Sequence, residues 1–250
     1  MKYLALCLVC VFLFVGCRLS DPGAAVDAAG DAYKAATLSN EDARLLASKA
    51  SAAYDNQNKR IIAGPGSKYD KRLRALVASL GNEGGQQFNF KVYMSSQVNA
   101  FAMADGTIRV FSGLMDLMND NELLFVIGHE IGHVVDGDTL DKLRVAYAAS
   151  AARKGAGAVS GTGTAGAVIN ALPQSELGAL AEQVINAQFS QSQESDADKY
   201  GLNLLKKLNK DIKAAVTALR KLAGGSGGGS SILSSHPDPN ARADKMEELR

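Results

Sequence analysis

The segment Asn121–Val135, NELLFVIGHEIGHVV, decides how the rest of the chain is arranged. Its apolar residues leave little polar surface, so we predict a central helix that is buried on nearly all sides. Two histidines in its second half break this apolar surface. Burying an unsatisfied polar group costs about 1–3 kcal/mol, so a core helix gains nothing from two imidazoles without partners. The helix is therefore expected to carry a functional site.

His129 and His133 lie four residues apart, within His129-Glu130-Ile131-Gly132-His133. This spacing places both imidazoles on one face of a helix, where both can bind one metal ion. Glu130 turns towards the neighbouring edge of the same site and can act as general base on zinc-bound water. The alternative is a pair of satisfied core histidines. We favour the metal site and expect one Zn²⁺ per chain.

Two glycines, Gly128 and Gly132, precede the two histidines. Each should cost about 1 kcal/mol relative to alanine inside a helix. A close approach of another backbone, or of a substrate, would explain this cost.

A catalytic zinc usually has three protein ligands and one open position. The best third candidate is Glu194, which begins a helical segment and has Asp198 four residues later on the same face. Glu194 would bind the metal, and Asp198 would accept the outer N–H of a liganding histidine. The alternative is an exposed acidic helix start, favoured by the helix dipole. The spacing alone does not decide between them.

The N-terminus has the pattern of a secretory signal peptide over residues 1–16. Its apolar run, Leu4–Val15, is too short to span a bilayer comfortably. The ending Phe14-Val15-Gly16-Cys17 resembles a bacterial lipobox, which predicts lipidation of Cys17. The alternative is an ordinary cleaved signal with a chance cysteine.

Residues 17–37 are rich in Ala, Gly and Asp and suit a tether between lipid and domain. All three cysteines precede residue 18, so the mature domain has no disulfide. Removing residues 1–16 removes one of 27 basic residues and leaves 26, equal to the number of acidic residues. Charge therefore gives no indication of nucleic-acid binding.

The remaining chain, residues 38–250, predicts an α+β domain with a small mixed sheet and an exposed edge strand packed on the buried helix. Three strands are expected around Phe88–Val92, Val98–Met103 and Thr107–Phe111, with a turn at Asp105-Gly106. Further helices are expected at about residues 39–58, 67–80, 174–190, 193–208 and 211–222.

Two segments rich in small residues interrupt this pattern. Residues 145–171 could in principle form a transmembrane hairpin, but Arg153, Lys154 and many glycines favour small-residue helices and a loop over the site. Residues 224–231 read as a Gly-rich loop.

His236 follows this loop and is the third histidine of the chain. It could lie over the zinc and stabilise a tetrahedral oxyanion as an N–H donor. The alternative is a surface histidine in a turn. Arg242 could pair with a nearby carboxylate.

Several motifs together resemble the gluzincins of peptidase family M48, which includes HtpX-like and CAAX-prenyl proteases. They are HEIGH followed by Glu-x-x-x-Asp, Asn99–Ala102, Ile108–Leu114, Asn121–Leu123, and His236-Pro237 with Arg242. The resemblance covers about residues 39–250 and implies Glu194 as third ligand. Members often carry a further histidine where this chain has Asp138; in the family that position is not a zinc ligand.

We therefore expect a zinc metalloendopeptidase that cleaves unfolded or misassembled envelope proteins. Asn99, Ala100, Phe101 and Ala102 would bind substrate as an added strand. Lipidated Cys17, with Arg18 after it, predicts an outer-membrane lipoprotein facing the periplasm, near the outer-membrane assembly machinery. One alternative is an assembly factor or chaperone with minor peptidase activity. A weaker one is a secreted zinc-binding module, since structural sites favour four ligands rich in Cys.

Overall fold

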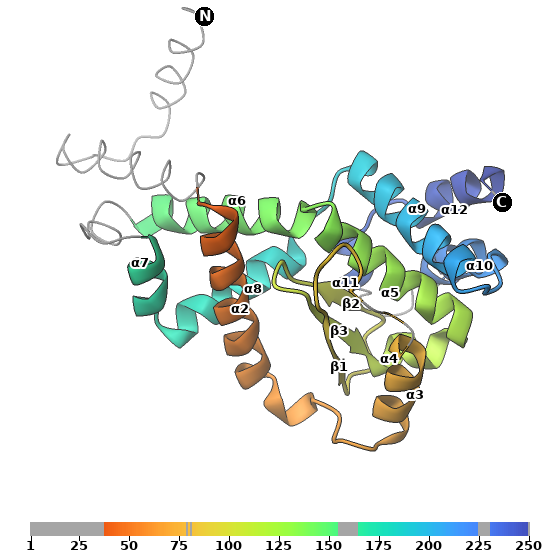
Figure 1. Ribbon diagram of the computed structural model, residues 1–250, viewed down its shortest axis with the longest axis horizontal. Helices are drawn as coiled ribbons and strands as arrows, with labels where there is room; N and C mark the ends of the chain where they lie inside the picture. The colour runs from red at the N-terminus through yellow and green to blue at the C-terminus, as the bar shows by residue number, and fades with distance from the viewer. Residues whose placement is uncertain (1–37, 79, 81, 155–164, 225–230, 250) are drawn as a thin grey trace, which may run out of the picture.

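A three-stranded sheet with helices on both faces forms the centre of the structure (Figure 1). This computed structural model describes residues 38–78, 80, 82–154, 165–224 and 231–249. Residues 1–37, which contain the expected signal peptide, Cys17 and the expected tether, lie outside the described residues. So do residues 155–164 of the loop expected over the site and most of the Gly-rich segment.

The sheet consists of β1 (Asn89–Tyr93), β2 (Ala100–Ala102) and β3 (Thr107–Phe111), in the order β1-β3-β2. β1 runs parallel to β3, and β2 runs antiparallel to it. The turn between β2 and β3 contains Gly106 at φ +86°, a conformation that glycine adopts without steric cost. The expected strands, the Asp105-Gly106 turn and the mixed sheet are confirmed.

β2 lies at the edge of the sheet and pairs with a strand, β3, on one side only, as an edge strand should, and its side chains are buried. Its three residues are at most 7% exposed. Helices cover both faces of the sheet: Ala100 and Ala102 belong to the core around the central helix, whereas Phe101 packs into the core on the opposite face. An edge strand between two helical layers has buried side chains, while its second backbone edge pairs with no strand of the described residues.

Helices make up most of the remaining structure. The described part of the chain starts with α2 (Asn40–Gln57), a short 3₁₀ turn η2 (Lys59–Ile61) and α3 (Lys68–Val77). After the sheet come α4 (Ser112–Leu117), α5 (Asp120–Val135), α6 (Asp138–Lys154), α7 (Ala165–Ala171), α8 (Gln174–Asn186), α9 (Gln191–Lys207), α10 (Lys213–Gly224), α11 (Ser231–Ser235) and α12 (Pro239–Glu248). The helices expected from periodicity are confirmed, with ends that shift by a few residues.

Local side-chain caps explain where several of these helices begin. Ser39 and Ser67 accept hydrogen bonds from backbone N–H groups three residues later, which fixes the starts of α2 and α3. α5 begins with a capping box between Asn119 and Glu122, in which each side chain bonds to the other residue's backbone. These contacts are encoded within four residues and form independently of the tertiary fold.

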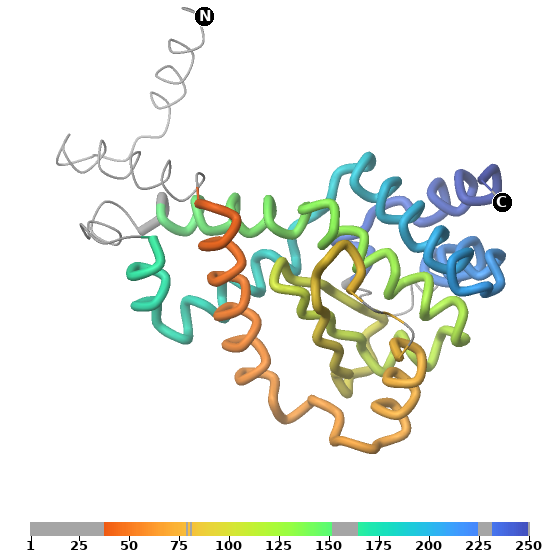
Figure 2. The backbone as a smooth tube through the Cα atoms, in the orientation of Figure 1, coloured from red at the N-terminus to blue at the C-terminus, as the bar shows by residue number. Residues whose placement is uncertain are grey.

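The core has two parts, one on each side of the sheet. α5 packs with α9, α10 and α12, and these helices lie together at one end of the molecule (Figure 2). α2, α6, α7 and α8 form the other group. Among the helices of the described ranges, none has the length and apolar composition needed to cross a bilayer.

Candidate metal centre

The close packing of α9 against α5 brings two distant parts of the sequence together. A Cβ atom on Gly128 would lie 2.9 Å from the Cα of Gly201, and one on Gly132 would lie 3.0 Å from the Cα of Ala197. Any larger side chain at either glycine would push the helices apart. The expectation that these glycines admit another backbone is confirmed, and the backbone is that of α9.

Four side chains from three segments converge beside this contact. They are His129 and His133 on α5, Glu194 in the first turn of α9, and His236 just after α11. One potential ligand atom from each lies within 4.8 Å of all the others. Each residue is at most 5% exposed.

The distances between the donor atoms suit a single small cation. His129 Nε2 lies 3.1 Å from both His133 Nε2 and His236 Nδ1. Glu194 Oε1 lies 3.3 Å from His133 Nε2 and 2.8 Å from His236 Nδ1. Two nitrogens bound tetrahedrally to one Zn²⁺ are about 3.3 Å apart, given ordinary Zn–N bonds. The histidine and carboxylate donors thus fit zinc.

The outer nitrogens of both α5 histidines meet carboxylates. His129 Nδ1 lies 2.9 Å from Asp198 Oδ1, and His133 Nδ1 lies 2.8 Å from Asp138 Oδ2. When Nδ1–H donates to a carboxylate, the lone pair of Nε2 is left facing the centre of the cluster. The hydrogen bond to Asp138 also raises the pKa of His133, against the effect of burial.

Arg242 on α12 joins the carboxylates of α9. Its Nε and Nη2 donate to Asp198 at 2.8 and 2.6 Å, and its Nη1 forms an ion pair with Glu194. Burial opposes ionisation of Asp198, but the Arg242 hydrogen bonds hold the pKa of that carboxyl below its ordinary value. Arg242 therefore holds Asp198 in its charged form and also contacts Glu194.

Glu194 itself is held ionised within the cluster. Its burial disfavours the charge, yet the neighbouring His236 and His129, with the hydrogen bond from His133, keep the pKa of the carboxyl well below its usual range. A buried carboxylate surrounded by imidazoles is the form that binds a metal cation.

Glu130 points into the same space but is held differently. It is 1% exposed, and its Oε1 has no hydrogen-bond partner in the described part of the chain. Burial raises the pKa of this carboxyl. His236 lies beside it, with its Nε2 3.5 Å from Glu130 Oε1. An unpartnered buried carboxylate oxygen beside a metal-ligand cluster is well placed to accept a proton.

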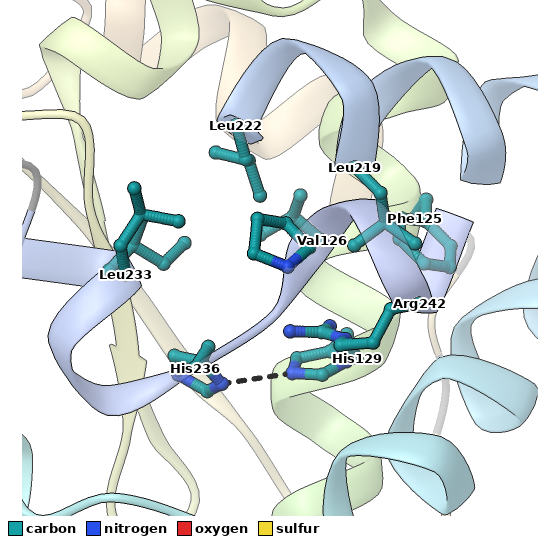
Figure 3. Close-up of a pocket in the computed structure, with 10 residues that line it drawn as sticks. Phe125, Val126, His129, Leu219, Leu222, Leu233, His236 and Arg242 are labelled. Atoms are coloured by element: carbon teal, nitrogen blue, oxygen red, sulfur yellow. Dashed lines mark hydrogen bonds between the residues drawn. The ribbon is translucent and has the colours of Figure 1, made fainter. Parts of the chain in front are cut away.

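His236 is a buried member of the site and not a surface residue. Figure 3 shows it linked to His129 at the edge of an apolar pocket. Burial lowers the pKa of His236 to about 4. The pocket is lined by side chains of α5, α10, α11 and α12, including Phe125, Val126, Leu219, Leu222 and Leu233.

The structure brings together Glu130, His129, His133, Glu194, Asp198 and His236. By contrast, Asn99, Ala100, Phe101 and Ala102 lie in and before β2, which packs against α5. The Asn99 side chain is buried, and its Oδ1 has no partner in the described ranges.

Sequence reasoning did not identify the contact of Asp138 with His133, nor the Phe189 ring, which stacks on the His133 imidazole at 3.6 Å and 5°. Asp138 follows the glycine turn that ends α5, five residues after His133. This short separation could have indicated its contact with His133. Nothing in the sequence around Phe189 indicates that its ring meets an imidazole 56 residues earlier.

Comparisons with known proteins agree with this geometry. The sequence model of peptidase family M48 matches residues 67–250. The chain is 42% identical to the metalloprotease YcaL of Escherichia coli K12, over 94% of this chain and 92% of YcaL. It is 40% identical to the metalloprotease LoiP of the same organism, over 95% and 91% of the two chains.

A more distant relative shares only part of its length. The β-barrel assembly-enhancing protease of Yersinia pestis is 29% identical over 70% of this chain, which corresponds to 38% of that protein. With a buried group of metal-ligating residues on α5 and α9 and two metalloproteases aligned along nearly its whole length, this chain belongs to peptidase family M48 and is a metallopeptidase.

Proposed function

We propose that this protein is a zinc endopeptidase that cleaves unfolded or misassembled polypeptides of the bacterial cell envelope. The observation that supports the proposal is the position of Glu130, whose unpartnered buried Oε1 lies 3.5 Å from Nε2 of His236, beside the cluster of His129, His133 and Glu194. A purely structural metal site has no use for a base beside the metal. This feature favours hydrolysis over the zinc-binding module and over an assembly factor without chemistry.

Each residue of the metal centre has its own proposed role in peptide hydrolysis. His129, His133 and Glu194 would hold the zinc, which when bound makes a water acidic enough to attack at neutral pH and polarises the peptide carbonyl. Glu130 takes the proton of the attacking water and delivers it to the leaving amine. His236 donates an N–H to the oxyanion that forms on the carbonyl. Asp198, Asp138 and Arg242 keep the ligands oriented.

β2 is the proposed docking strand for the substrate. It pairs with β3 on one side, and an extended polypeptide could pair with its other edge through backbone hydrogen bonds. Backbone pairing depends little on the side chains of the substrate. It therefore suits a protease that acts on many unfolded chains. The amide oxygen of Asn99, just before this strand, is buried and has no partner in the described ranges, so a substrate N–H could satisfy it only if the surrounding side chains move.

The direct test uses one model protein in two states. Purified mature protein with zinc should cleave the substrate when it is unfolded and leave its folded form largely intact, because only an extended chain can pair with β2. A chelator should abolish cleavage, and added zinc should restore it. Cleavage that persists in the chelator would contradict the metal mechanism, and equal cleavage of both forms would contradict the substrate class.

We also propose that Cys17 is lipidated and anchors the protein in the outer membrane, facing the periplasm. The lipobox-like ending of residues 1–16 and Arg18 support this proposal, since Asp after the cysteine is the usual inner-membrane retention signal in enteric bacteria. Wild type should fractionate with outer membranes, and Cys17→Ala should not. Identical partitioning of the two would rule out the lipid anchor.

A further inference from the structure

Lys142 on α6 lies beside the metal centre, and the mechanism above does not use it. Its Nζ is 3.3 Å from the centre of the Phe189 ring. The same ring stacks on the His133 imidazole with 3.6 Å between centroids. Because both groups lie so close to one ring centre, they must lie on its opposite faces. One aromatic ring therefore separates the ammonium from a residue of the metal site.

The described residues provide no ionic partner for this ammonium. The adjacent Asp141 pairs with Arg144, and Asp138 accepts hydrogen bonds from His133 and Gln193. Lys142 itself makes a cation–π contact with Phe189, and its N–H groups donate no hydrogen bond to any residue of the described ranges. Burial lowers the pKa of Lys142 to about 8, so most of the side chain remains charged at neutral pH.

A cleft opens next to Lys142, between α6 and the segment from α8 to α9. Its volume of about 380 Å³ falls in the range of binding pockets for small groups. Small or amide side chains line much of it, and Val145 at its side is 70% exposed. The lining residues include Val145, Ala146, Ala149, Ala187, Gln188 and Gln193. The cleft thus offers room, apolar contact for methylene groups and one cation, Lys142. Asp141 also lines the cleft, but its carboxylate is paired with Arg144.

We propose that this cleft is a subsite for an acidic side chain of the substrate polypeptide, with Lys142 as the residue that sets the preference. The inference rests on the proposed function, because the side-chain anions of an unmodified polypeptide are carboxylates. A Glu side chain would place its methylenes along the α6 wall and its carboxylate on the Lys142 ammonium. The single ring between this ammonium and His133 puts the subsite close to the scissile bond.

The test measures cleavage of a peptide library in which Glu, Gln or Lys occupies each of the three positions on either side of one scissile bond. Wild type should prefer Glu over Gln by about 10- to 100-fold at one position, the range expected for a hydrogen bond to a charged group. Lys142→Gln should remove this preference, Lys142→Arg should keep it, and Lys142→Glu should favour Lys instead. Lys199→Gln, an exposed lysine on α9 paired with Asp196, is the matched control and should keep the wild-type ratio.

Because each ratio is taken within one variant, a general loss of turnover does not affect it. If Lys142→Gln slows cleavage of all peptides alike and keeps the Glu preference, Lys142 only supports the Phe189 ring and the subsite is wrong. Wild-type cleavage without any acidic preference would overturn the subsite but leave the proposed function intact. If wild type cleaves neither peptides nor unfolded proteins, the proposed function fails and the subsite fails with it.

Discussion

In Glu130→Gln, peptide hydrolysis is expected to fall by about 10²–10⁴-fold, the usual contribution of a positioned general base. The substitution keeps the size and shape of the side chain but removes the proton acceptor. Zinc content should stay at the wild-type level, because Glu130 is not one of the proposed ligands. The fold should also remain intact, since Glu130 Oε1 has no hydrogen bond to lose in the described ranges. Turnover of an unfolded model protein and metal analysis check both expectations.

This variant also separates the peptidase from the assembly factor. The β2 edge would still bind unfolded chains, so Glu130→Gln should trap substrates without releasing products. Cells that lack the protein and receive this variant should keep their envelope-stress phenotype if cleavage is the function. Normal cleavage by Glu130→Gln would show that the proposed mechanism is wrong. Full rescue without cleavage would make the assembly factor the better account.

Replacement of Glu194 should have the second large effect, on the metal itself. Wild type should contain about one zinc per chain, and Glu194→Ala should lose metal affinity by more than the roughly 10–100-fold typical of losing an outer hydrogen-bond partner. The substitution removes a carboxylate that faces His133 and His236 at 3.3 and 2.8 Å. Elemental analysis after dialysis measures the loss. Tight zinc in Glu194→Ala would exclude Glu194 as a ligand.

His236→Ala is the matched control for this experiment, because it removes another buried group from the same cluster. As the donor to the oxyanion, His236 should leave zinc bound when replaced, and turnover should fall by about 10²–10³-fold. Because His236 belongs to the group of potential ligands, the zinc content and turnover of His236→Ala each test its role. Loss of zinc would make His236 a ligand, and unchanged turnover would make it a bystander.

Features that depend on residues near each other in the sequence could be predicted well. The capping residues Ser39 and Ser67 fixed two helix starts through contacts three residues away. Alternation along Phe88–Val92 and the Asp105-Gly106 turn indicated the sheet, whose strands lie within 23 residues. The pair His129 and His133 required only the helical repeat to share a face.

The pairing of α5 with α9 could be anticipated only in part. Gly128 and Gly132 indicated that a backbone approaches the helix, but not which one. Family resemblance, and not spacing, selected Glu194. The burial of the β2 side chains could not be predicted from the strand itself, because it depends on two helical layers that each combine distant parts of the chain.

The sequence by itself determined the chemistry of the site: two imidazoles one helical turn apart, a base between them, and carboxylates at a helix start. The tertiary structure alone decided which partners complete it. Arg242 meets Asp198 and Glu194, and Lys142 meets Phe189 over His133, only because helices distant in sequence pack side by side. Helical periodicity fixes which residues share a face, whereas contacts between helices depend on how whole side-chain surfaces fit together.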